Sequence, residues 1–477
     1  MSKLTKRHDR RAFLKASAYS ALGVLASSLA CRPQLSHARY QSGLGPLKRA
    51  PGGLLSLPKG FRYVVVQEAG AALSDGFKMP PQPDGMACFN GPKGELILLR
   101  NHELGDAEFI ARWGKELLPY PDGKVPTPHH RQGVYGGVTR VVLDPQKLDE
   151  DFARRAGKTS RAIAHSNLVL CGTDKNCAGG VVQGGWVSCE ESSREGHGYA
   201  FMTRPEDGAL HSPRRLDSWG RMQREAVAHD PKSGIIYMTE DHKDAAFYRF
   251  VPINPNEPTG KGHVDALVIK GLPHTHPYTH TQGSTQVPRH WEPKKRWNAH
   301  WVRVPDPSAR ELPCREQAAA LGATRFRRTE GITIDDAGVW FVASTGGCAH
   351  AGQLFRFIPR GASKGELVLE YEVSDRRILS SPDNIVMTPW GELLLAEDNY
   401  ESGGGVVTHQ FLRIMNAEGG FYDLARNNAR DHARGTPGAE FTGACFSPDG
   451  RTLFVNLQNP TQMTLAIQGP WPRAKAL

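Results

Sequence analysis

Six stretches of the chain repeat one order of residues: a polar turn with glycine, an apolar run, and then a polar or acidic cluster. They are 94–103, 185–191, 234–241, 338–345, 391–398 and 450–458. The turn at 447–450, Ser-Pro-Asp-Gly, has the residue types that set up hairpins. Each apolar run is therefore predicted to be a strand that leaves a tight turn.

The spacing of these units, roughly 50 residues with two longer gaps, is typical of the blades of a β-propeller. Glycine and proline are plentiful, at 51 and 34 residues, and helical periodicity is rare. We predict an all-β protein, a six-bladed β-propeller with helical and loop excursions. The mature chain, 39–477, is expected to be a single domain and a monomer, with an insertion around 252–327.

The acidic residues that follow these runs are expected to meet. If equivalent strands approach one central axis, their ends form a ring. The carboxylates that would converge there belong to Glu103, Glu190, Glu240 and Glu397. Like carboxylates in one funnel repel each other unless a cation neutralises them, so the pattern favours a multivalent cation site. The alternative is that these acids begin solvated loops.

A thiol stands at one of these strand ends, where Cys189 precedes Glu190 and Glu191. Thiolate sulfur favours iron, zinc or copper, whereas carboxylates favour calcium, magnesium or manganese, so this is a mixed ligand set. Once a signal peptide that contains Cys31 is removed, seven of the eight cysteines remain. An odd count leaves at least one unpaired, and Cys189 is our candidate. The other interpretation is a small buried cysteine with no ligand role.

Three further fragments carry candidate ligands. Arg328 and Glu330 lie one residue apart, so on an extended segment their side chains share a face. They could form only a salt bridge, or Glu330 could bind a metal while Arg328 grips a phosphate. Arg224-Glu225 offers a similar arrangement, and Asp383-Asn384 offers oxygen ligands suited to calcium, although a plain turn would also explain that pair.

The N-terminus is predicted to be a twin-arginine export signal, residues 1–38. Arg10 and Arg11 precede a short apolar run over 16–30, which is too short for a stable membrane span, and Ala38 ends a small-x-small cleavage site. Cys31 leaves a lipoprotein as the alternative. We expect the twin-arginine export machinery to be a partner and the mature protein to be periplasmic or secreted.

The formal net charge of +10 does not indicate nucleic-acid binding. The predicted signal holds seven Lys or Arg residues against one Asp, which is most of that charge. No dense basic block follows it, so no nucleic-acid partner is predicted.

Several motifs in one order resemble the PhoX family of exported alkaline phosphatases, from about Gly60 to Gln458. These segments are Asn101-His102-Glu103, Asn176-Cys177-Ala178-Gly179-Gly180, Trp186 to Glu191, Thr239-Glu240-Asp241, Phe247 to Phe250, Arg328 to Ile332, Ser381 to Asn384, Phe446 to Gly450 and Asn456 to Gln458. The resemblance implies a six-bladed propeller that hydrolyses small-molecule phosphate monoesters with ferric iron (Fe3+) and calcium (Ca2+). A departure is His242-Lys243, where the family pattern would have arginine.

The resemblance also implies roles for individual residues. The family's iron-ligating cysteine falls on Cys189, and its phosphate-contacting arginine falls on Arg328, the expected catalytic residue. The resemblance places carboxylate ligands on Glu190, Glu240 and Glu330. From their positions in the motifs we further expect Asp383 and Glu397 to bind calcium.

Two other functions stay open. One is a calcium-dependent propeller hydrolase of the lactonase or phytase type, which would use the carboxylate ring but give the thiol no role. The other is a metal-stabilised propeller that binds a ligand or partner without catalysis. Iron in the purified protein would distinguish a phosphatase from the calcium-dependent hydrolase. Turnover of phosphate esters would distinguish it from the non-catalytic binding protein.

Overall fold

The computed structural model describes residues 43–111, 119–120, 123–275, 293–398, 409–431, 436–437, 440–459 and 461–473. The predicted signal peptide with Arg10, Arg11 and Cys31 lies outside these residues. In the part of the chain that is described, no helix is both long and apolar enough to cross a membrane.

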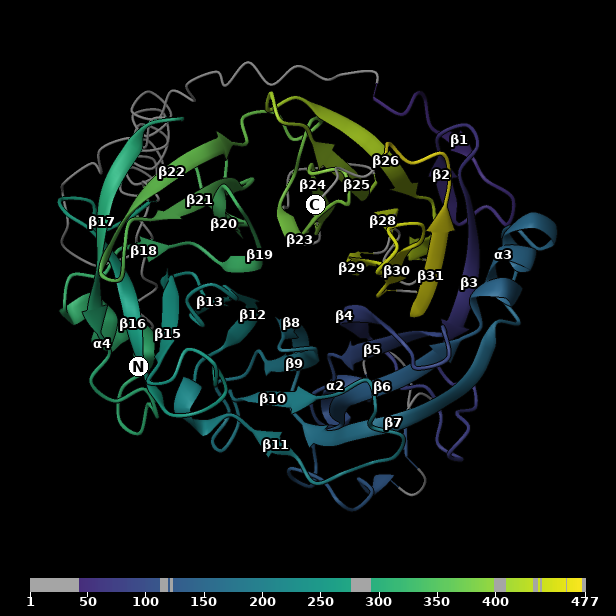
Figure 1. Cartoon of the computed structure of the whole chain (residues 1–477), viewed down its shortest axis with the longest axis horizontal. Helices are drawn as coiled ribbons and strands as arrows, with labels where there is room; N and C mark the ends of the chain where they lie inside the picture. Colours follow the sequence, from purple (N-terminus) through teal and green to yellow (C-terminus); the bar gives the residue numbers. More distant parts are fainter. Residues whose placement is uncertain are drawn as a thin grey trace, which may run out of the picture.

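The sheets stand around a common centre in a propeller-like, all-β arrangement (Figure 1). One sheet consists of β4 Pro83–Asn90, β5 Leu96–His102, β6 Gly136–Leu143 and β7 Ile163–Thr173. The next consists of β8 Asn176–Val182, β9 Gly185–Glu190, β10 Ala200–Thr203 and β11 Arg214–Arg215.

A nine-stranded sheet follows, in the order β12-β13-β15-β16-β17-β22-β21-β20-β19. Its strands are β12 Arg224–His229, β13 Ile236–Glu240, β15 Tyr248–Pro252, β16 Gly262–Ile269, β17 Arg296–Arg303, β19 Thr329–Asp335, β20 Gly338–Ala343, β21 Gln353–Pro359 and β22 Lys364–Glu372. Strand β17 pairs with β16 on one side and with β22 on the other, which joins two four-stranded groups. Part of the predicted insertion, 252–327, is therefore sheet.

Two more sheets complete the circle. One has the order β1-β2-β26-β25-β24-β23, and the other has the order β29-β30-β31-β3. Their strands are β1 Lys48–Arg49, β2 Leu55–Leu57, β23 Pro382–Met387, β24 Leu393–Glu397, β25 Phe411–Met415, β26 Phe421–Asn427, β29 Phe441–Phe446, β30 Leu453–Leu457, β31 Met463–Gln468 and β3 Arg62–Glu68. Because β3 pairs with β31, the early and late parts of the chain share one sheet (Figure 1).

Two-stranded pairs and short helices lie outside these sheets. Two-stranded pairs join β14 Ala245–Ala246 to β18 Arg325–Phe326 and β27 Arg430–Asp431 to β28 Thr436–Pro437. The short helices are α2 Ala107–Ala111, α3 Pro145–Arg154, η3 Asp217–Trp219 and α4 Cys314–Ala320.

Apolar side chains fill the space between neighbouring sheets. Leu394 and Leu412 of one sheet share a cluster with Leu453 and Leu465 of the next. Within the nine-stranded sheet, Phe341 stacks on Phe247 at 4.1 Å between ring centroids and on Phe355 at 5.3 Å. Strands covered on both faces read as continuous apolar runs, which is why the six runs were visible in the sequence. All six are strands, and each is the second strand of a hairpin: β5, β9, β13, β20, β24 and β30.

Strands β4, β8, β12, β19, β23 and β29 are innermost, and each borders the next around the centre (Figure 1). Each pairs with the strand that follows it in the chain, so its first residues lie beside the last residues of that second strand. The functional side chains stand at this end.

Candidate metal and phosphate centre

The second residue of each innermost strand forms the first layer of the centre. In five strands this residue is acidic or a thiol, and in β29 it is Thr442. The five are Asp84, Cys177, Glu225, Glu330 and Asp383, and all are buried.

A bulge marks each of these positions. In every innermost strand the register with its hairpin partner shifts directly after the first or second residue. Bulges leave backbone groups unpaired and re-aim side chains. Asn101 Nδ2 donates to the carbonyls of Cys177 at 2.9 Å and Ala178 at 2.8 Å, and Asn456 Nδ2 donates to that of Asp84 at 2.7 Å. These amides stabilise the bulges that expose the ligand side chains.

The residue directly after each second strand forms the second layer. These residues are Glu103, Glu191, Asp241, Ser344, Asp398 and Gln458. The two layers are in contact, because Ser344 Oγ donates to Glu330 Oε1 at 2.7 Å. Gln458 Nε2 likewise donates to Asp84 Oδ2 at 2.6 Å and to Glu103 Oε2 at 3.0 Å.

The residues directly before the innermost strands form a third layer, which includes two cations, Lys175 and Arg328. Four of these residues have left-handed backbone, with φ of 51° at Gln82, 52° at Lys175, 55° at Arg328 and 45° at Ser381. Such strained backbone is uncommon for residues other than glycine and clusters at functional sites. The last residue in this layer, before β29, is Glu440.

Arg328 lies among the carboxylates. Its Nε and Nη2 bind the two oxygens of Asp241 at 2.8 and 2.9 Å, and Nη2 is 3.2 Å from Glu330 Oε1. Glu330, followed by Asp241, raises the pKa of Arg328. Lys175 is the second cation, and its pKa is raised chiefly by the charge of Glu191. The predicted proximity of Arg328 and Glu330 is confirmed.

Burial and mutual repulsion raise the pKa values of the carboxyl groups. Burial, with the charge of Asp398 second, raises the pKa of Asp383 to about 7. Burial also raises the pKa values of Asp84, Glu103, Glu191, Glu225, Glu330 and Glu440. Asp84 Oδ1 and Glu225 Oε2 are buried without a hydrogen-bond partner. Multivalent cations would neutralise the buried, mutually repelling carboxylates and would bind the oxygens that lack a hydrogen-bond partner. The residues therefore fit metal ions.

The possible ligands of the centre form four overlapping groups, in each of which the ligand atoms lie within 4.8 Å of one another, and a fifth group, His130/Glu190/His197, shares no residue with them. The four are Asp84/Glu103/Cys177, Cys177/Glu191/Glu225, Glu225/Glu330/Asp383 and Asp383/Asp398/Glu440. The first two groups share one thiol, which tolerates a soft or borderline cation, and the last two have only oxygen, which suits a hard cation.

The thiol of this centre is Cys177 and not Cys189. Cys177 Sγ is 3.2 Å from Glu225 Oε1 and 3.8 Å from Asp84 Oδ2. Cys189 packs in a hydrophobic cluster with Val187 and Met238, where burial raises its pKa to about 12. It is free, as are Cys88, Cys171, Cys177, Cys314 and Cys445.

The structure does not bring Glu190, Glu240 and Glu397 into the centre. Glu190 accepts hydrogen bonds from the amides of Asp174, Gly198 and Tyr199 and contacts His197 Nδ1 at 2.7 Å. Glu240 binds Tyr248 and Arg315, and Glu397 binds Arg413. Successive side chains of a strand point to opposite faces, so the next residues, Glu191, Asp241 and Asp398, point inward instead. Of the predicted ligands, Glu330 and Asp383 lie in the cluster, as does Glu103 of the predicted ring.

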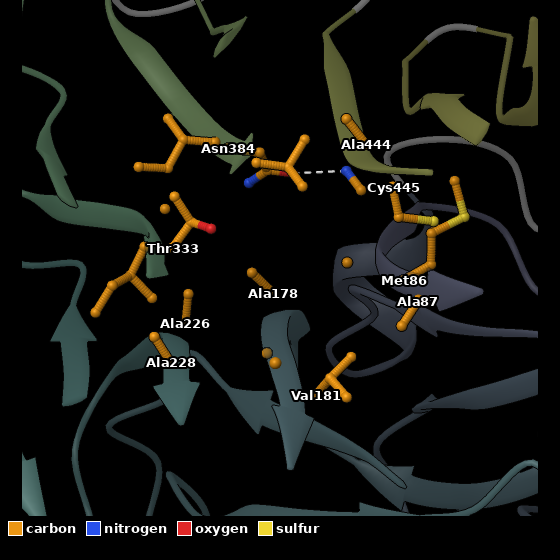
Figure 2. A pocket seen from close by; sticks show the side chains of 18 of the residues that line it. Met86, Ala87, Ala178, Val181, Ala226, Ala228, Thr333, Asn384, Ala444 and Cys445 are labelled. Carbon is orange, nitrogen blue, oxygen red and sulfur yellow. Dashed lines mark hydrogen bonds between the residues drawn. The ribbon is translucent and has the colours of Figure 1, made fainter. Parts of the chain in front are cut away.

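A cavity of about 390 Å³ continues along the axis beyond the first layer (Figure 2). Small apolar residues line it, among them Ala178, Ala226, Ala228 and Ala444. Asn384 separates it from the carboxylates: its Oδ1 accepts from Gly443 N at 2.6 Å, and its Nδ2 donates to Asp383 Oδ1 at 3.0 Å. The polar chemistry is thus confined to one end of the axis.

Fold and centre together define an all-β, propeller-like protein with a central cluster of candidate metal ligands. The model of the alkaline phosphatase PhoX family matches residues 42–461, and the chain belongs to this family. It is thus a phosphatase, of the class of phosphoric monoester hydrolases.

A solved structure shares the fold. Pseudomonas fluorescens PhoX, in complex with vanadate as a transition state analogue, is 17% identical, with 89% of this chain and 97% of that chain covered and a TM-score of 0.59. A gluconolactonase of Xanthomonas campestris is 13% identical, with 89% and 99% covered and a TM-score of 0.36. Regucalcin of Agrobacterium tumefaciens is 10% identical, with 87% and 99% covered and a TM-score of 0.35. No curated protein matches the sequence.

Proposed function

We propose that the chain is an exported alkaline phosphatase that hydrolyses phosphate monoesters at the central cluster, with Fe3+ and Ca2+ as its metals. The observation that carries this proposal is the run of overlapping ligand groups with a single thiol, Cys177, beside two cations, Arg328 and Lys175. The thiol-containing groups suit iron and the all-oxygen groups suit calcium. In the proposed ligand set Cys177 replaces Cys189, and Glu330 and Asp383 are kept. Glu190, Glu240 and Glu397 give way to the other acids of the four groups, Asp84, Glu103, Glu191, Glu225, Asp398 and Glu440.

The residues of the chain have distinct parts in the reaction. When bound, the metal ions would neutralise phosphate charge and lower the pKa of attached water. Arg328 would orient the phosphoryl group through its fork of N–H donors, which Asp241 holds in place. Lys175 would meet the same oxygens from the neighbouring sheet, as a point charge.

Architecture and location extend the proposal. We infer six blades, with β12-β13-β15-β16 and β19-β20-β21-β22 counted as two blades joined by β17. The mature protein would be one such domain, 39–477, monomeric, with an insertion around 252–327. Export would use the twin-arginine signal over 1–38, to the periplasm or the medium.

Purification of the mature protein followed by elemental analysis and a p-nitrophenyl phosphate assay tests the function. We expect iron and calcium in stoichiometric amounts, together with turnover at alkaline pH. Calcium without iron, combined with lactone hydrolysis, would instead favour the lactonase alternative. Full metal content without turnover of any phosphate ester would favour a binding protein.

Substitution of the two cations tests their roles. We expect Arg328→Gln and Lys175→Gln each to lower kcat/KM for p-nitrophenyl phosphate by about 10- to 100-fold, because each removes a charge-assisted contact to the transition state. Inhibition by inorganic phosphate should weaken in parallel. The control is Arg377→Gln, an exposed arginine that pairs with Asp375. Unchanged phosphate inhibition in both variants would rule out phosphate contact by these residues.

A further inference from the structure

One asparagine lies on the axis directly behind the carboxylates of the centre. The third residue of each innermost strand is glycine or alanine in five strands and asparagine in β23: Gly85, Ala178, Ala226, Gly331, Asn384 and Gly443. A Cβ atom on Gly85 would come within 2.6 Å of Ala178 Cα, and one on Gly331 within 2.9 Å of Asn384 Cα. The strands are therefore too close here for larger residues. Among these six positions, Asn384 carries the only polar side chain.

A bulge allows the side chains of Asp383 and Asn384 to meet. In a regular strand, successive side chains point to opposite faces, which would keep these two apart. The pairing of β23 with β24 shifts register between Pro382 and Ile385, so both residues lie within the irregular segment. As a result Asn384 Nδ2 donates to Asp383 Oδ1 at 3.0 Å, and both residues are buried.

The neighbouring sheet fixes the other end of the Asn384 amide. Gly443 N, in β29, donates to Asn384 Oδ1 at 2.6 Å (Figure 2). The oxygen of a side-chain amide accepts hydrogen bonds and its nitrogen donates them. Because the backbone N–H of Gly443 requires the oxygen on its side, the nitrogen is the atom that faces Asp383. The backbone of one sheet thus sets the direction of a hydrogen bond to a ligand on the next.

Asp383 is the carboxylate through which the two groups with only oxygen ligands meet. These groups are Glu225/Glu330/Asp383 and Asp383/Asp398/Glu440. An ionised carboxylate has about four lone-pair sites, and the donation from Asn384 takes one of them. Rotation of the Asp383 carboxylate would break this bond. Asn384 therefore limits the orientations in which Asp383 offers its remaining sites to the two groups.

We propose that Asn384 is a positioning residue of the centre, which orients Asp383 as a calcium ligand and does not itself bind the metal. Hydrogen bonds from outside the ligand set orient ligating carboxylates, and loss of one typically lowers metal affinity or activity by about 10- to 100-fold. Asp383 belongs to neither of the groups that contain the thiol, so iron should be unaffected. This inference rests on the proposed function for the identity of the two metals.

Calcium titration of the iron-containing mature protein, after its calcium has been removed with a calcium-selective chelator, tests this role without turnover. We expect Asn384→Ala to raise the calcium dissociation constant, measured by calorimetry, by about 10- to 100-fold and to keep the iron content of the unaltered protein. Asn384→Asp has nearly the same shape and still accepts from Gly443 N. An ionised carboxylate there cannot donate to Asp383 and adds a like charge, so this variant should weaken calcium binding at least as much.

Asn167→Ala is the matched control, because it removes a buried asparagine far along the same kind of sheet. Asn167 lies on β7, at the opposite edge of its sheet from β4, and its Nδ2 donates to the carbonyls of Leu168 and Asp207 at 3.1 and 3.2 Å. Its removal should lower the unfolding midpoint but leave the calcium dissociation constant within about twofold.

The outcomes separate the positioning role from its alternatives. Unchanged calcium affinity in either variant of Asn384 overturns it, and full affinity in Asn384→Asp alone would make the side-chain oxygen at this position a ligand. Loss of iron together with calcium also overturns it, because the whole centre would then be disrupted. Absence of calcium binding by the unaltered protein overturns the inference along with the proposed calcium. Lack of phosphate ester turnover by the calcium-loaded protein, in contrast, overturns only the proposed function.

Discussion

Replacement of Cys177 by alanine is expected to remove iron from the purified protein and to lower phosphatase kcat/KM by about 10³-fold. The thiol belongs to two of the ligand groups, with Asp84 and Glu103 and with Glu191 and Glu225. Without it these groups contain only oxygen ligands, which bind a soft or borderline cation less well. Loss of a metal that stabilises transition-state charge costs several kcal/mol, and about 1.36 kcal/mol is a factor of ten in rate.

Cys189→Ala is the matched control for this substitution. It deletes one thiol of equal size from the adjacent strand, where Cys189 packs among apolar side chains. We expect it to lower the free energy of unfolding by about 1 kcal/mol through the space that it leaves. Iron content and turnover should stay near those of the unaltered protein. Iron loss in Cys189→Ala with retention in Cys177→Ala would return the ligand role to Cys189.

Removal of the metals is expected to make the stability of the protein fall as pH rises. The folded-state pKa of Asp383 is about 7, above its usual value of 3.8. Between these two values the folded protein binds a proton that the unfolded chain has released, so the unfolding free energy decreases with increasing pH. The stabilisation from Asp383 is complete below pH 4 and lost above about pH 7. Each pKa unit corresponds to about 1.36 kcal/mol.

Thermal unfolding between pH 5 and pH 8, in chelator and with metals restored, checks this expectation. We expect the midpoint in chelator to fall by on the order of 5 °C relative to the metal-loaded protein over this range. Comparison of the two series at each pH cancels groups common to both, such as buried His102, whose lowered pKa acts in the opposite direction. A constant difference between the two series from pH 5 to pH 8 would contradict the expectation.

Asp383→Asn tests two effects of this carboxylate: its destabilising charge in the metal-free protein and its role as a metal ligand in the active protein. The neutral amide should raise the unfolding midpoint of the chelated protein at pH 8, because it removes a buried charge among like charges. It should also lower calcium content and phosphatase activity. The control, Asp336→Asn, changes a carboxylate whose side chain is 97% exposed, and none of these three quantities should change.

The strands and their convergence were predictable because both depend on local patterns. A glycine turn followed by an apolar run specifies a strand wherever it occurs, and all six runs are strands. The inward-facing residues were not predictable in the same way. Glu190 and Glu191 differ only in which face of the chain they occupy, and one residue of register decides it. The strands were therefore assigned correctly, whereas of the four acids assigned to the ring Glu103 lies in the centre and Glu190, Glu240 and Glu397 do not.

The first-layer ligands could have been found from hairpin geometry. In an antiparallel pair the start of the first strand lies beside the end of the second, as Pro83 lies beside His102 and Asn176 beside Glu190. An acid or thiol at the start of the first strand of a hairpin is thus expected beside the acid that follows the second strand. That rule selects Asp84 and Cys177. The bulges that aim them depend on side chains from other strands, such as Asn101, and no local pattern shows those contacts.

The pairing of β3 with β31 has a consequence for biosynthesis. Residues 62–68 are made long before their partner, residues 463–468. The ligand groups are likewise spread from Asp84 to Glu440. The centre therefore cannot assemble until residue 440 has left the ribosome, and binding of a full set of metals must wait for that step. Fragments that stop before residue 463 should remain open to proteases however much iron or calcium is supplied.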